Sequence, residues 1–327
     1  MSSASTENRS LWKEILIATR IIFKANSGHF HALSILFLFP IFFSLVVYPS
    51  FHLSLFHPDY DFITQPQLSN FFFSSFEIVV LVAYTLFLVL IFLCSVATIT
   101  YSAVHASYDR PINFVSSIKS IRNSFFPLLF TFIVSHAVFI SIALIFALSF
   151  VFIVQILQTL GFTELKYDSN HFLFLLIPAL IVLVPILIWL QVNWSLAYVI
   201  TVVESKWGFE TLRKSAYLVK GKRWIILSRV IFFGLVLFGL IGGGSMFLVI
   251  VSAAKGHQWR SLGVILQTAQ CSVMGYLVMS QFLVGNVVLY MYCKDLNGEK
   301  LPLEIRDKFA GEYVSLPLDE EKNHATV

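Results

Sequence analysis

Charged residues are scarce in this chain, and the shortage limits what the protein can be. Asp, Glu, Lys and Arg make up 12% of its 327 residues, about half the share typical of a soluble domain. Intrinsic disorder needs the opposite composition, with many charged and few apolar residues. Because 57% of the residues are apolar and the mean hydropathy is +0.82, a soluble globular protein is excluded as well.

Cysteine is also rare, and catalytic motifs are missing. The three cysteines lie in or at the end of apolar runs, so no disulfide framework is indicated. The sequence contains no nucleophile elbow, paired catalytic carboxylates, zincin motif or phosphate-binding loop. We therefore expect a protein that is not an enzyme and has no cofactor.

Metal ions and nucleic acids are not expected partners either. His52, His57, Asp59 and Asp61 are assigned to a loop without regular spacing, which favours a polar surface over a metal or ligand site. The basic residues are spread over segments beside apolar runs, which argues against a nucleic-acid-binding patch.

Six long apolar runs dominate what the sequence does contain. A helix that crosses the bilayer core needs about 20 residues, and the runs approach or exceed this length. They cover about residues 31–48, 78–101, 125–157, 172–203, 224–253 and 262–292. The runs do not alternate as membrane-barrel strands do. The predicted fold class is therefore all-α: a polytopic membrane protein with six transmembrane helices, in which residues 31–292 form the membrane domain.

Basic residues are distributed asymmetrically around these runs. Of the 22 Lys and Arg residues, 18 lie before the first run or after the second, fourth and sixth, 3 lie in the other loops, and Arg229 lies within the fifth run. The positive-inside rule predicts that residues 1–30 and the tail 293–327 are both cytosolic, in an endomembrane or the plasma membrane. The tail is expected to be disordered beyond Tyr313. Within it, Tyr313–Leu316 has the spacing of a sorting signal.

Three basic segments are amphipathic, and each leads into an apolar run. Residues 11–26, 111–124 and 208–223 carry apolar residues at helical spacing on one side and cations beside them. We expect two or three of them to be interfacial helices on the cytosolic face, with cations toward anionic lipid. The alternative is a basic loop with a helical stub. The candidate headgroup contacts are Arg213, Lys214, Lys220, Lys222 and Arg223.

The third of these segments carries a family resemblance. Residues 204–224, ESKWGFETLRKSAYLVKGKRW, resemble an element of the membrane domain attached to some bacterial glycerophosphodiester phosphodiesterases. Residues 10–305, including LYMYCKDLNGEKL at 289–301, resemble a family of plant six-span integral membrane proteins whose function is not established. The resemblance does not carry over an enzymatic activity, because the phosphodiesterase catalytic barrel is missing here.

Polar side chains in the apolar runs are further candidates for function, because they are costly in lipid. They are Arg229, Glu204, Asn193, His136, Gln281 and Asn286. Arg229 is expected to snorkel to the cytosolic surface or to pair with Glu204. The favoured interpretation of the set is interhelical hydrogen bonding that fixes packing.

A transport path is the alternative interpretation of these polar residues. Asn193, His136 and Gln281 lie at similar depth by residue count. Helix breaks at Pro178 and Pro185 would help to build a substrate site there.

Gly239 and Gly243 have the spacing at which membrane helices approach closely. We expect this pair to support packing within the monomer rather than dimerisation. The preferred function is a non-enzymatic membrane protein that organises anionic lipids or protein partners at the cytosolic face. The alternative is a transporter or channel with a path between spans three to six.

Overall fold

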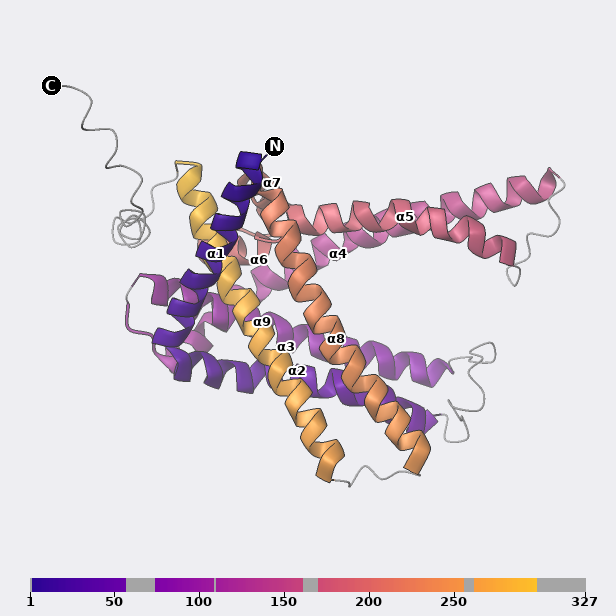
Figure 1. Cartoon of the computed structure of the whole chain (residues 1–327), viewed down its shortest axis with the longest axis horizontal. Helices are drawn as coiled ribbons and strands as arrows, with labels where there is room; N and C mark the ends of the chain where they lie inside the picture. Colours follow the sequence, from indigo (N-terminus) through magenta and orange to yellow (C-terminus); the bar gives the residue numbers. More distant parts are fainter. Residues whose placement is uncertain (1, 57–73, 109, 161–169, 256–261, 299–327) are drawn as a thin grey trace.

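The structure, a computed structural model, describes residues 2–56, 74–108, 110–160, 170–255 and 262–298, and this part of the chain is entirely α-helical (Figure 1). The helices are α1 (Ser2–Ala25), α2 (Ser27–Phe56), α3 (Ser75–Ser107), α4 (Phe114–Thr159), α5 (Asn170–Asn193), α6 (Ala197–Glu204), α7 (Phe209–Leu218), α8 (Arg223–Lys255) and α9 (Leu262–Leu296). Six spans are long and apolar enough to cross a membrane: α2, α3, α4, α5 with α6, α8 and α9. The predicted fold class is confirmed, and the chain is a multi-pass membrane protein.

The helices form three units, each with an amphipathic segment followed by two spans. The first unit is α1, α2 and α3, and the third is α7, α8 and α9. In the second unit the first turns of α4 are the amphipathic segment, and the spans are the rest of α4 and the pair α5–α6. Each amphipathic segment packs on the second span of another unit: α1 on α9, α4 on α3 and α7 on α6. Because the first unit packs on the third, the second on the first and the third on the second, the three units form a closed ring.

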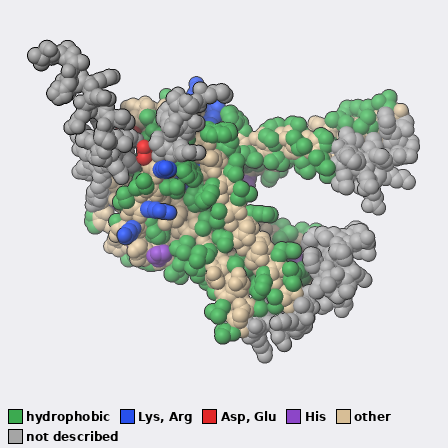
Figure 2. Space-filling model, in the orientation of Figure 1, with side chains coloured by type: hydrophobic (Ala, Val, Ile, Leu, Met, Phe, Trp, Pro, Cys, Tyr) green, Lys and Arg blue, Asp and Glu red, His purple; other side chains and the backbone are tan. Residues whose placement is uncertain are grey.

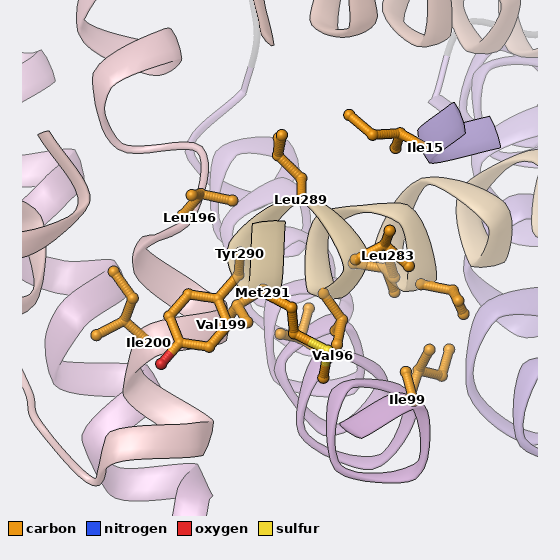
Figure 3. Packing of buried hydrophobic residues seen from close by; sticks show 14 of the residues in the cluster. Ile15, Val96, Ile99, Leu196, Val199, Ile200, Leu283, Leu289, Tyr290 and Met291 are labelled. Atoms are coloured by element: carbon orange, nitrogen blue, oxygen red, sulfur yellow. The ribbon is translucent and has the colours of Figure 1, made fainter. Parts of the chain in front are cut away.

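The second spans of the three units meet at the centre of this ring. There α3, α6 and α9 contact one another. Figure 3 shows the apolar side chains that they contribute: Val96, Ile99, Val199, Ile200, Leu289 and Met291. Of the most apolar stretch of α9, 61% is buried, against 6% for α4. The last helix that the structure describes, α9, is therefore the central one.

The hairpin of α4 and α5 projects away from the other spans (Figures 1 and 2). With 46 residues, α4 is about 70 Å long, which exceeds the roughly 30 Å of the hydrocarbon core. Along the outer part of the hairpin the side chains are apolar and exposed, as Leu144, Leu148, Ile177 and Ile181 illustrate. Such a surface suits contact with lipid.

Two local predictions about the spans are wrong. The fourth span continues through Pro178 and Pro185, and its break falls at residues 194–196, between α5 and α6. The segment 111–124 is not a separate interfacial helix either. Asn113 caps α4, its side chain accepting a bond from the Val115 amide at 3.2 Å, and the helix then continues into the span without interruption.

The prediction that Gly239 and Gly243 support close packing within the monomer is also wrong. A Cβ atom added to either residue would have no atom within 4 Å apart from its own helix and immediate neighbours. The close approach occurs one residue later, where a Cβ on Gly244 would lie 3.2 Å from Val46 of α2 and 3.3 Å from Cys271 Sγ of α9. Spacing alone could not decide which face of α8 turns inward.

A close glycine contact between spans involves Gly275 of α9, where an added Cβ would lie 2.6 Å from the buried ring of Phe42. We predict that Gly275→Leu lowers the free energy of unfolding by about 1–3 kcal/mol, because the α2–α9 contact would be overpacked. Thermal unfolding of the purified protein in detergent measures the effect. Gly239→Leu is the matched control and should leave the melting temperature unchanged or higher, since its surroundings are open. Equal losses for both variants would contradict this account.

Candidate functional site

The candidate site is the end of the bundle at which α1, the α3–α4 turn, α7 and the end of α9 lie, here called the basic face. Its described cations are Lys13, Arg20, Lys24, Arg110, Lys119, Arg122, Lys206, Arg213, Lys214, Lys220, Lys222, Arg223 and Lys294. In Figure 2 the visible Lys and Arg side chains gather at this end, and the projecting hairpin shows none in its described part. The charge asymmetry of the sequence thus corresponds to one end of the folded protein.

Helix α7 is anchored in the break of the fourth span. Ser215 Oγ donates to the carbonyl oxygen of Asn193 at 2.7 Å and accepts from the Leu196 amide at 3.3 Å. These are backbone groups that the interrupted helix leaves without their usual partners. The same side of α7 buries Thr211, Leu212 and Leu218. This side of α7 therefore faces the protein. The prediction that α7 lies as an interfacial helix on the headgroup layer is wrong in this respect.

A glycine turn sets the position at which α7 begins. Gly208 has a φ of 67°, and its amide donates to Thr131 Oγ1 of α4 at 2.9 Å. A Cβ at this position would lie 2.5 Å from the ring of Phe130. Only glycine combines this positive φ with such a close aromatic neighbour.

Glu204, at the end of α6, joins three elements of the basic face. Its carboxylate lies 2.8 Å from Lys214 Nζ of α7 and 3.6 Å from Lys294 Nζ of α9, and it accepts a bond from the Tyr290 hydroxyl at 2.7 Å. The Glu204 side chain is 12% exposed, so this ion-pair network is largely withdrawn from solvent. It fixes α7 and α9 relative to the fourth span.

Arg229 does not pair with Glu204 and does not reach the surface, contrary to both expectations. Its side chain is fully buried, and it donates to the carbonyl oxygens of Gly285 and Phe282 at 2.7 and 3.2 Å and to Asn286 Oδ1 at 3.3 Å. The guanidinium also lies 5.7 Å from the ring centroid of Phe233. Gly285 permits this approach, since a Cβ there would lie 2.5 Å from Arg229 Nη2. Arg229 therefore clamps α8 to α9.

The other polar residues of the spans do not form a shared site. Asn193 Nδ2 donates to the carbonyl oxygen of Trp189, and His136 Nδ1 lies 2.9 Å from that of Phe132. Each of these two contacts stays within the residue's own helix, α5 for Asn193 and α4 for His136. Gln281 is half-buried in α9. Of the predicted intramembrane set, only Arg229 and Asn286 contact each other.

The structure also adds a buried carboxylate that the sequence analysis missed. Glu77, in the first turn of α3, is buried and forms a capping box with Ser74, in which the Ser74 amide donates to Glu77 Oε2 at 2.6 Å. The spacing of Ser74 and Glu77 is the usual signal for such a cap and could have revealed it. The acidic charge at the start of α3 is favourable for the helix dipole.

No metal-binding group is found among the residues that the structure describes, where no three His, Cys, Asp or Glu side chains come together. His52 lies in α2 and is buried, so its assignment to a loop is wrong. His57, Asp59, Asp61 and the Tyr313–Leu316 sequence lie outside the described residues.

Exposed cations and aromatic rings remain on the outer side of α7 and at the start of α8. Arg213 and Lys220 are exposed, and so are the rings of Trp207, Tyr217 and Trp224. Aromatic rings beside cations are typical of the level of the lipid headgroups. This arrangement can hold anionic groups by charge.

The fold and this site define a class: a helical membrane protein of six spans, with a basic amphipathic helix docked into a broken span. The chain belongs to the family described as a domain of unknown function, DUF8558, which matches residues 12–322. No curated protein and no solved structure matches the chain.

The Glu204 network predicts a difference between two carboxylates only six positions apart. Glu204→Gln should lower the free energy of unfolding by about 1–3 kcal/mol, because Lys214 and Lys294 would each lose a charged partner at a poorly solvated carboxylate. Glu210→Gln is the control, since Glu210 pairs with Lys206 at an exposed site and should change stability by less than about 1 kcal/mol. Melting temperatures in detergent measure both. Equal shifts would show that the network does not hold α7.

Proposed function

We propose that this protein is a non-enzymatic membrane organiser whose basic face lies in the cytosol and gathers anionic lipid headgroups. The observation that carries the proposal is that α7 is buried on one side and exposed on the other. One side is fixed to the protein through Ser215, and the other presents Arg213 and Lys220 among exposed aromatic rings. The cations are therefore held in place before they meet lipid, which reduces the entropy lost on binding.

Cytosolic placement of the basic face rests on the charge asymmetry. The positive-inside rule assigns the end richer in Lys and Arg to the cytosol. That end carries both α1 and the end of α9 (Figure 1), which agrees with an even number of spans. The resemblance to plant six-span proteins and to the membrane domain of bacterial glycerophosphodiester phosphodiesterases fits a lipid-facing role without a catalytic barrel. The membrane would be an endomembrane or the plasma membrane, and protein partners could share the face.

Lipid enrichment around the reconstituted protein tests this function. Full-length protein in phosphatidylcholine vesicles should show stronger energy transfer to fluorescent phosphatidylserine than to fluorescent phosphatidylcholine. Arg213→Gln with Lys220→Gln should weaken the preference, because each cation near an anionic surface contributes about 1 kcal/mol. The double variant Lys206→Gln with Glu210→Gln leaves the net charge unchanged and should behave as wild type. No preference for phosphatidylserine in the wild type would refute the proposal.

One observation favours the second candidate, a transporter or channel between spans three to six. At the break of the fourth span, Asn193 Oδ1 and Thr211 Oγ1 are buried without a hydrogen-bond partner. Broken helices with unpaired polar groups line the substrate sites of many transporters.

Planar-bilayer recordings of the purified protein in potassium chloride separate the two candidates. A channel through the break predicts a conductance that Asn193→Leu abolishes, because the substitution removes the polar group from the path. The lipid-organising function predicts no conductance for either protein. Thr201→Val, which removes a hydroxyl whose donated bond goes to its own helix at 3.0 Å, is the control for unspecific effects in this region.

A further inference from the structure

Helices α5 and α8 contact each other at the basic face and diverge away from it (Figure 1). The contact includes Trp189, near the end of α5, and Arg223, the first residue of α8. Figure 2 shows open space between the projecting hairpin and the rest of the protein. We call the opening between these two helices the α5–α8 wedge. Both helices expose large apolar side chains beyond the contact, among them Ile181 on α5 and Leu235 on α8.

The apex of the wedge carries a cation that lacks an acceptor. The Arg223 guanidinium stacks on the Trp189 ring at 4.7 Å from its centroid. Its Nε atom is buried and has no hydrogen-bond partner. A stacked guanidinium holds its donors in one plane, which suits a phosphate oxygen.

The backbone around Arg223 adds to this preference for an anion. Arg223 opens α8, whose first turn contains no acidic residue. Lys220 is exposed, and the positive φ of Gly221, 94°, turns the chain into the helix with nothing within 4 Å of an added Cβ. The positive end of the helix dipole and the cations Lys220 and Arg223 thus lie within four residues of one another in the chain.

The composition of α5 indicates what fills the wedge below this apex. Residues 170–193 contain no glycine or serine and a single alanine, Ala179. Membrane helices associate through small residues that allow close approach, whereas large branched side chains suit acyl chains. The wedge therefore fits lipid tails better than a helix of a second copy.

We propose that the α5–α8 wedge binds one anionic glycerophospholipid of the leaflet on the basic face. Its phosphate contacts Arg223 and Lys220 at the start of α8, and its acyl chains lie between α5 and α8. This inference rests on the proposed function, because it assigns one defined site to the lipid contact of the basic face. Unlike a general charge attraction, this site recognises one lipid molecule through both its phosphate and its acyl chains.

Native mass spectrometry of the full-length protein, titrated with phosphatidylserine in detergent, tests the site. Arg223→Ala should weaken binding of the first lipid by about fivefold or more, the equivalent of roughly 1 kcal/mol per cation. Arg223→Lys should also weaken it, because lysine keeps the charge but loses the planar stack on Trp189. The double variant Lys206→Gln with Glu210→Gln, which removes an exposed ion pair and keeps the net charge, is the control and should leave the first binding step unchanged. Equal effects of Arg223→Ala and of this control would overturn the proposal.

Crosslinking locates the acyl chains independently of affinity. Phosphatidylserine with a photoactivatable group in its tail should label peptides from both α5 and α8 in the wild type. The Arg223→Ala variant should lose this labelling. Labelling spread evenly over α2, α3 and α9 would refute the wedge as the binding place. If anionic enrichment persisted in vesicles while these two tests failed, the proposed function would stand and only this site would fall.

Discussion

Ser215 occupies the break between α5 and α6, and the positions of all charged residues on α7 depend on this contact. Backbone groups in an apolar environment must find partners within the protein, so an interrupted span is stable only where another polar group replaces the missing helix bonds. The Ser215 hydroxyl does so for both a carbonyl and an amide. The same docking brings Lys214 to Glu204 and turns Arg213 outward.

Two buried charges, Arg229 and Glu204, have partners within the protein, which distinguishes them from the exposed cations of the basic face. Arg229 is held by carbonyl oxygens of α9, and Glu204 by two lysines and a tyrosine. Both join helices near the basic face and leave the outer cations unengaged by these networks. In the proposed function, this ring of three units with cations on its rim would serve as a scaffold for lipid headgroups, because α7 and α9 are fixed to the fourth span.

The second unit, which contains the projecting hairpin, packs differently from the other two units. The first and third units pack along the length of their spans, whereas α4 and α5 contact the others mainly near the basic face. The proposed lipid site lies in this region, where lipid tails would reach between helices of the same chain. A lipid bound there would have its phosphate at the basic face and its tails between α5 and α8. Its binding would therefore couple the lipid composition of the leaflet to the position of the hairpin.

The number of spans, the end at which the cations gather and the presence of amphipathic segments could all be predicted from the sequence. They follow from run length, charge placement and helical periodicity, which are local properties of the chain. The contacts between helices could not be predicted in this way: Arg229 binds α9 instead of Glu204, Gly244 instead of Gly239 lies against neighbouring helices, and the fourth span breaks at residues 194–196 instead of at the prolines. These contacts depend on which faces of distant helices meet, and no local sequence pattern determines how one helix is rotated against another.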